Sequence, residues 1–198
     1  MERNFFVVNF FRSRLPYMHD VTPKVVAMAV RTVMTMWMIF WMMSFLFNIR
    51  CTATRWQGAR EEQTDKSFVQ FKSMAYGYRA AWKILQTYYD RFCGQEKPFT
   101  VRNIIERWAP PSENDTEAYI RNVLKLSSIG GKEKLLPPRN VAGYGRLSRL
   151  LAAMTCIECG ICPSEVDHEA IGMGYRLAFP QQSDELDCWL AAEDSYRY

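Results

Sequence analysis

The chain has 198 residues, of which 48% are hydrophobic and 23% are charged. This composition excludes collagen-like, low-complexity and generally disordered proteins, because enough apolar surface is present to offset the entropy lost on ordering, and the length suits one ordinary domain with an appendage. A net charge of +4 is too small to indicate a nucleic-acid partner, and two histidines, His19 and His168, leave little material for a histidine-rich metal site.

The charge is unevenly distributed along the chain. Residues 1–47 hold 5 basic and 2 acidic residues, residues 48–140 hold 16 and 10, and residues 141–198 hold 4 and 9. The basic middle region favours an anionic polymer such as a cell-wall glycan, whereas the acidic end would repel one. A surface of interspersed, solvated charges is the alternative interpretation.

The first predicted element is an apolar helix over residues 25–47. Six of the 11 methionines lie between Met28 and Met43. As a helix the segment would be about 34 Å long, against a hydrocarbon thickness of about 30 Å. Arg31 would cost about 2.5 to 3.5 kcal/mol at mid-membrane, but it lies near the start of the segment and can snorkel toward Lys24. We predict an uncleaved membrane anchor of undetermined orientation, with a buried core helix as the alternative.

The predicted core domain spans residues 48–130. Segments 49–52 and 67–71 have the residue types of strands and predict a small β-hairpin. Three helices are then predicted from apolar residues at helical spacing and from capping residues: over 78–92, over 101–108 after a cap at Thr100, and through residue 126 after a cap at Asn114 or Asp115. The expected fold class is α+β, mostly α, with the hairpin followed by a helical bundle and preceded by the N-terminal hydrophobic helix.

A linker is predicted over residues 131–145, because paired glycines and paired prolines interrupt the helical pattern there. Residues 146–198 are predicted to form a helical hairpin and tail, in which the first helix ends near Gly160 and Pro163 opens the second. Acidic side chains on the second helix argue against nucleic acid as a partner, since a DNA-binding helix would have to face phosphates.

One cysteine pattern is similar to part of an iron–sulfur motif. Cys156, Cys159 and Cys162 have C-x2-C-x2-C spacing and precede Pro163, but the fourth cysteine of that motif is missing. Thiols three residues apart on a helix also pack as small hydrophobic groups. We therefore predict no metal and no cofactor, with a zinc site or cluster as the alternative, and the redox state of these cysteines stays open.

Four segments resemble a family of phage and prophage virion structural proteins that have a lysozyme-like, peptidoglycan-directed character. They are FNIR (47–50), RWQGA (55–59), FVQFKSMAYGYRAAWKILQTYY (68–89) and TVRNIIERWAPPSENDTEAYIRNV (100–123). The resemblance implies that residues 48–130 form a lysozyme-like core domain. Family members reach Asn-Ile-Arg through an asparagine-rich turn, which this sequence lacks. The alternative to an anchor is therefore that residues 1–46 derive from an altered reading frame or a truncated gene.

The resemblance also implies a peptidoglycan glycosidase or lytic transglycosylase, whose catalytic acid works from an apolar pocket. Lysozyme-like folds place this acid just before the small hairpin, but no acidic residue occurs here between Asp20 and Glu61. Glu61 and Glu62 are the first candidates to replace it as the catalytic acid, and Glu106 and Glu113 are further candidates. The residues expected to bind glycan are Trp56, Tyr76, Tyr78 and Arg79.

Two functions follow from these observations. The first is a phage- or prophage-derived virion structural protein directed at the bacterial cell wall, either as a degenerate muramidase or lytic transglycosylase or as a binding remnant. The alternative is a non-catalytic, membrane-tethered or assembly protein whose aromatic residues form the core. The expected partners are peptidoglycan or virion proteins. The protein would be membrane-anchored or virion-associated, or cytoplasmic if residues 25–47 are not inserted.

Overall fold

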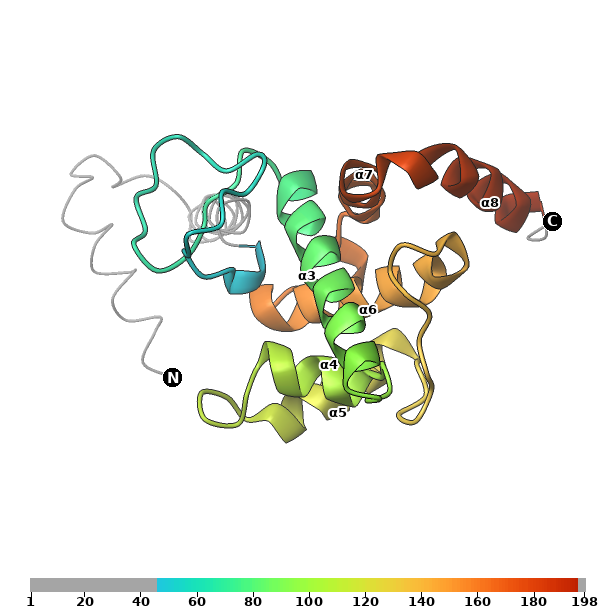
Figure 1. Ribbon diagram of the computed structural model, residues 1–198, viewed down its shortest axis with the longest axis horizontal. Coiled ribbons are helices and arrows are strands. Elements are labelled where there is room, and N and C mark those ends of the chain that lie inside the picture. Colours follow the sequence, from blue (N-terminus) through green and yellow to red (C-terminus); the bar gives the residue numbers. More distant parts are fainter. Residues whose placement is uncertain (1–45, 196–198) are drawn as a thin grey trace, which may run out of the picture. The chain divides into compact units, whose positions relative to one another are not determined.

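The computed structural model describes residues 46–195, all of which fall in one compact unit (Figure 1). Within this range the chain is helical. The α-helices are α3 (Met74–Gly94), α4 (Val101–Trp108), α5 (Thr116–Ser127), α6 (Tyr144–Cys159), α7 (His168–Ala178) and α8 (Ser183–Ser195). Short 3-10 turns are η1 (Leu46–Asn48), η2 (Val141–Gly143), η3 (Pro163–Glu165) and η4 (Pro180–Gln182).

Helix α3 runs through the middle of the described part and packs against α7 and α6 (Figure 1). Its side chains Tyr78, Trp82 and Leu85 are fully buried. The indole Nε1 of Trp82 donates a hydrogen bond to the carbonyl of Ile171 in α7 (3.2 Å), and the Tyr78 hydroxyl lies 3.0 Å from the Thr155 hydroxyl in α6. The hydrophobic core therefore includes residues on both sides of the predicted linker 131–145.

Local capping explains where several helices begin and end, and it confirms the predicted helical segments. The Thr100 side chain accepts from the backbone N–H of Asn103 at the start of α4, and Asp115 accepts from that of Ala118 at the start of α5. Helix α6 ends at Cys159 and is capped by Gly160, which has φ of 64°. These interactions satisfy backbone groups that helix termini would otherwise leave without partners.

The second helix of the predicted C-terminal hairpin begins later than expected. Pro163 starts the short turn η3, and α7 begins only at His168, because the Asp167 side chain accepts from the N–H of Ala170 and so caps the helix there. A proline is compatible with the first position of either helix type, so its presence alone could not fix the boundary.

The predicted β-hairpin, and with it the α+β lysozyme-like fold class, is wrong. Residues 49–71 contain only two isolated antiparallel bridges among the described residues, Arg50 with Phe68 and Ala59 with Phe71, and they form no sheet. The strand pattern of 67–71 is misleading because Val69, Gln70 and Phe71 are all buried, whereas a half-buried strand alternates between faces.

Side-chain hydrogen bonds hold this segment as a loop in place of a strand ladder. The buried Gln70 side chain accepts from the backbone N–H of Thr64 (2.7 Å), and the Gln63 side chain accepts from the N–H of Gln70 (2.7 Å). Asp65 accepts from the N–H groups of Ser67 and Phe68. Side-chain acceptors thus satisfy the N–H groups of Ser67, Phe68 and Gln70. The two predicted strands are joined only by backbone hydrogen bonds from Cys51 to Ser67 and from Val69 to Ile49, each of 2.8 Å, among the described residues.

No helix within residues 46–195 is long and apolar enough to cross a membrane. The predicted anchor, residues 25–47, lies outside the described residues except at its last two positions. Of these, Phe47 is buried in the core, where its ring makes edge contacts with Tyr78 (5.4 Å between ring centroids) and Trp108 (5.6 Å). Phe47 is therefore part of the helical core.

Candidate functional site

The two carboxylates predicted to be catalytic lie on an exposed loop. The Glu61 side chain is 92% exposed and its Oε1 lies 3.5 Å from the Nζ of Lys72, and Glu62 is exposed beside it. A glycosidase acid requires an apolar surrounding that favours its protonated form. The loop does not provide this surrounding for Glu61 or Glu62.

The residues predicted to bind glycan do not share one surface, because one of them is buried in the core and the others are half-buried. Tyr76 packs on Gly58, where a side-chain carbon would meet the Tyr76 ring at 2.0 Å, and both Tyr76 and Trp56 are half-buried. Tyr78 points into the core toward α6, and burial raises the pKa of its hydroxyl. The Nε of Arg79 donates to the carbonyl of Leu177 near the end of α7 (3.3 Å). Tyr78 therefore cannot share a surface cleft with the others.

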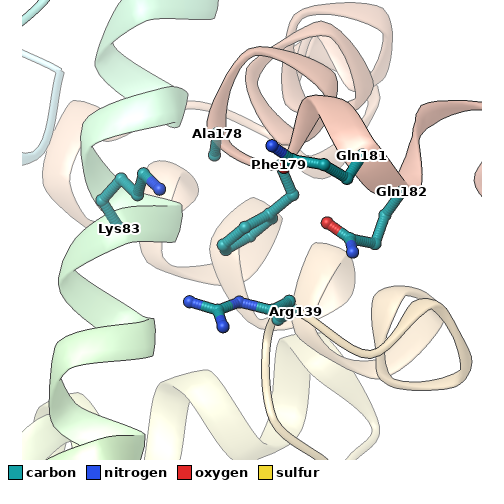
Figure 2. A pocket seen from close by; sticks show the side chains of 6 residues that line it. All are labelled: Lys83, Arg139, Ala178, Phe179, Gln181 and Gln182. Carbon is teal, nitrogen blue, oxygen red and sulfur yellow. The ribbon is translucent and has the colours of Figure 1, made fainter.

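A basic pocket lies next to Arg79, between α3, the loop that precedes η2, and the turn from α7 into η4. It has a volume of about 400 Å³. Figure 2 shows Lys83 on α3 and Arg139 on the loop directed toward the space around the Phe179 ring, with Gln182 opposite. These residues come from three separate segments of the chain, so no local sequence pattern groups them.

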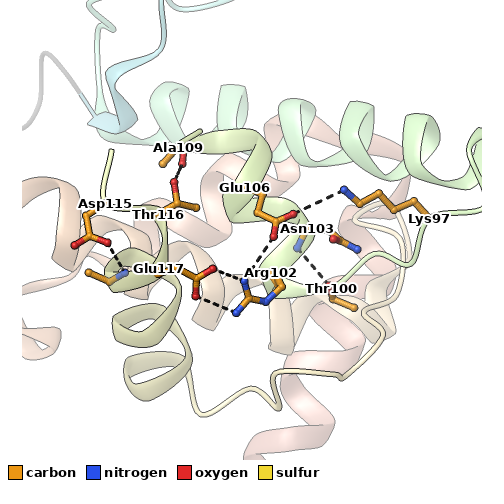
Figure 3. Close-up of polar contacts among 10 residues, drawn as sticks. Lys97, Thr100, Arg102, Asn103, Glu106, Ala109, Asp115, Thr116 and Glu117 are labelled. Carbon is orange, nitrogen blue, oxygen red and sulfur yellow. Dashed lines mark hydrogen bonds and ion pairs between the residues drawn. The ribbon is translucent and has the colours of Figure 1, made fainter. Parts of the chain in front are cut away.

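A second hollow, of about 390 Å³, is lined by residues of the fourth segment of the family resemblance, 100–123. Beside it, Arg102 forms a two-pronged ion pair with Glu117 (2.6 and 3.1 Å) and also contacts Glu106, which Lys97 approaches to 3.9 Å (Figure 3). The hydrogen bond and charge of Arg102 lower the pKa of Glu117. Glu117 is therefore held as an anion and is unsuited to donate a proton.

The same segment has a complete structural role. The Thr116 hydroxyl donates to the carbonyl of Ala109 (2.5 Å), which closes the turn between α4 and α5 (Figure 3). Asp115 caps α5, and Glu113 pairs with Arg50 at 2.5 Å, so the turn is also tied to the residues that follow η1. These interactions account for the sequence of the turn without catalysis.

Glu158 is a further carboxylate that lies in a network of side-chain hydrogen bonds. It is half-buried near the end of α6, where its Oε1 accepts from the Tyr119 hydroxyl (2.7 Å) and its Oε2 from the Asn48 side chain (3.1 Å). Burial, together with the negative charge of Glu158, raises the pKa of Tyr119. The three residues lie far apart in the sequence, and no local pattern indicates this network.

The described side chains provide little for acid or metal chemistry. None of the carboxylates among them is buried, and no group of three or more His, Cys, Asp or Glu residues in residues 46–195 could hold a metal ion. Cys156 is buried in α6, and burial raises the pKa of Cys159 to about 11, so both are held as neutral thiols. Of the three cysteines in the C-x2-C-x2-C pattern, Cys156 and Cys159 thus pack against the core from α6, while Cys162 is exposed.

Comparison with known proteins gives the class that the geometry leaves open. No family model matches the chain. The chain is similar to a curated phage protein, so it is a helical protein related to a phage protein. The relative is Protein P5 of Pseudoalteromonas phage PM2, which is 41% identical over 125 residues that make up 63% of this chain and 70% of the relative. The chain belongs to the family of this P5 protein.

Proposed function

We propose that the chain is a virion-associated structural protein of a phage or prophage, and that it acts through contacts with other virion proteins. The observation that carries the proposal is the kinship with a phage protein over most of that protein's length. A structural role suits a helical unit whose resemblance segments serve the core and the helix caps, as Phe47, Asp115 and Thr116 do.

Analysis of purified particles tests this role. Particles produced from the phage or prophage that encodes the chain are banded in a density gradient, and the chain is quantified by mass spectrometry against the major coat protein. We expect the chain to co-migrate with particles in a constant ratio through a second gradient, while an abundant host protein is lost. Recovery of the chain only in the soluble lysate would overturn the proposal.

Cell-wall cleavage is the second candidate, and the resemblance to peptidoglycan-directed phage proteins favours it. Glu61, Glu62 and Glu158 are the carboxylates to test, and the glycan-binding roles of Trp56, Tyr76, Tyr78 and Arg79 stay predictions. The full chain and its Glu61→Gln, Glu62→Gln and Glu158→Gln variants are assayed on purified peptidoglycan. Glu96→Gln is the control, because Glu96 is exposed and its side chain has no described contact.

The outcome of the peptidoglycan assay separates the two candidates. Clearing by the full chain that one of the three substitutions abolishes, and that Glu96→Gln retains, would support an enzyme. Because no carboxylate among the described side chains is buried, we expect no clearing by a folded protein. Circular dichroism of each variant distinguishes loss of activity from loss of fold.

A further inference from the structure

The basic pocket beside α3 holds an uncompensated cluster of positive charge. Arg79 and Arg139 each lie close enough to act on the charge of Lys83, and no carboxylate with a described side chain forms an ion pair with any of the three. Burial, followed by the charges of Arg79 and Arg139, lowers the pKa of Lys83. Glu185 lines the adjacent hollow together with Arg139, without pairing with it. A bound anion would relieve this repulsion.

Two parts of the pocket wall are held in place by the surrounding helices, namely the backbone of Arg139 and the ring of Phe179. The backbone N–H of Arg139 donates to the side-chain oxygen of the buried Gln86 on α3 (2.9 Å), and the Arg139 carbonyl accepts from the Tyr175 hydroxyl on α7 (3.4 Å). The Nζ of Lys83 lies 5.1 Å from the centre of the Phe179 ring, which is almost completely buried. Such preorganisation lowers the entropic cost of binding a ligand.

The donors in the pocket suit a tetrahedral oxyanion. Arginine offers a planar fork that can contact two oxygens at once, and lysine adds a compact charge from another direction. Figure 2 shows the amide of Gln182 on the opposite side, and Gln181 also lines the pocket. A carboxylate would offer two oxygens in one plane, whereas a phosphate group can accept from several directions at once.

The extent of the charged surface indicates a small ligand. A nucleic-acid strand or a membrane is bound by cations spread along its phosphates. Here the cations gather around one hollow of about 400 Å³, and the adjoining hollow is lined by the acidic Glu185. We propose that this pocket binds the phosphate group of a small phosphate-bearing molecule, with Lys83 and Arg139 as the charged contacts and the Gln181 and Gln182 side chains as further donors.

Inorganic phosphate is the probe that tests this site, and the test does not depend on virion association. The melting temperature of the full chain is measured in rising phosphate and in chloride of equal ionic strength, and the affinity is determined by calorimetry. We expect phosphate, and not chloride, to raise the melting temperature. Lys83→Met and Arg139→Gln should each weaken phosphate binding by about tenfold or more, since each removes a charge-assisted contact. Lys125→Met is the matched control, because Lys125 is exposed on α5 and does not line the pocket.

Stability without phosphate separates a binding role from a structural one. Lys83→Met removes repulsion and keeps an unbranched stem over Phe179, so its melting temperature in chloride should equal or exceed that of the unmodified chain. If Lys83→Met fails to fold, the phosphate affinity of Arg139→Gln decides between the two roles. This variant should fold, since the hydrogen bonds that hold residue 139 use its backbone and not its side chain. Equal phosphate affinity in Arg139→Gln and the unmodified chain would overturn the proposal.

Two further results would also overturn it. One is the absence of any phosphate-specific rise in melting temperature. The other is binding of a single-stranded oligonucleotide, or of phosphatidylglycerol vesicles, that millimolar phosphate does not compete away and that the Lys83 and Arg139 substitutions abolish. That result would assign the same cations to an extended polyanionic surface.

Discussion

Phe47 shows how much one residue can contribute to this fold. It has a φ of 69°, and Asn48 follows with φ of 45°, so two successive residues other than glycine adopt the left-handed backbone conformation. Such conformations cost about 1–3 kcal/mol each and persist only where the surrounding structure compensates. The buried Phe47 ring and the hydrogen bond from Asn48 to Glu158 supply this compensation.

Replacing Phe47 should therefore destabilise the protein strongly. We expect Phe47→Ala to lower the free energy of unfolding by about 3–5 kcal/mol, because it removes a buried ring and leaves a cavity beside Tyr78 and Trp108. Urea denaturation measures this loss. Phe68→Ala is the control, because Phe68 is half-buried and lies outside the core cluster. A loss for Phe47→Ala no larger than that for Phe68→Ala would contradict the assignment of Phe47 to the core.

At the scale of the elements, the packing of α7 against α3 depends on the absence of a side chain at Gly174. A carbon added at this position would lie 2.5 Å from the Tyr78 side chain and 2.9 Å from the backbone nitrogen of Arg79. We expect Gly174→Ala to cost about 1–3 kcal/mol, because a backbone atom cannot move aside as a side-chain end can.

Gly172 in the same helix is the matched control for Gly174. A carbon added there would meet only the ends of the Tyr144 and Arg176 side chains, at 3.2 and 3.3 Å, and these can shift. The higher helix propensity of alanine should then keep the change for Gly172→Ala within about 1 kcal/mol. Thermal or urea unfolding of both variants checks this, and similar losses would show that close helix contact at Gly174 is not the cause.

The cap of α5 gives a second prediction at this scale. Asp115→Ala should cost about 0.5–2 kcal/mol, because the N–H of Ala118 loses its acceptor and the helix terminus loses a favourable negative charge. Asn114→Ala serves as the control, since Asn114 is exposed beside the cap and its side chain makes no described hydrogen bond. Denaturation in urea measures both changes. An equal effect of the two substitutions would show that the Asp115 side chain is not the cap of α5.

For the whole molecule, the buried hydroxyl and thiol groups predict a loss of stability at alkaline pH. Burial raises the pKa of Tyr175 to about 12 and that of Cys159 to about 11, and it also raises the pKa of Tyr78, Tyr119 and Tyr144. The folded protein thus holds these protons more tightly than the unfolded chain. Their stabilisation is complete below the unfolded values, which are near 9 for the thiol and 10 for the tyrosines, and is lost as pH rises through the folded values.

Urea midpoints measured under reducing conditions from neutral pH to about pH 11 check this prediction. We expect the midpoint to fall progressively above about pH 9. Tyr144→Phe should make the fall shallower, and it removes no described hydrogen bond of the Tyr144 hydroxyl. A midpoint that stays constant over the whole range would rule out tight burial of these groups.

Much of the helical part was predictable because helix signals are local. Apolar residues at helical spacing predicted a helix over 78–92, which lies within α3, and Thr100 predicted the start of α4. The loop 49–71 was not predictable in the same way. Whether a segment with strand-like residues pairs along its length depends on competing side-chain hydrogen bonds such as those of Gln63 and Gln70, which residue type does not reveal.

The amino-acid sequence by itself determined the helical segments, several of their caps and the kinship with phage proteins, because these depend on neighbouring residues and on residue order. Only the tertiary structure decided which distant side chains meet. Gln86 holds Arg139 across 53 positions of the chain, and Tyr119 meets Glu158 across 39. Such contacts follow from how α3, α5, α6 and α7 pack, and helix packing depends on the complete set of buried side chains, so no local pattern contains it.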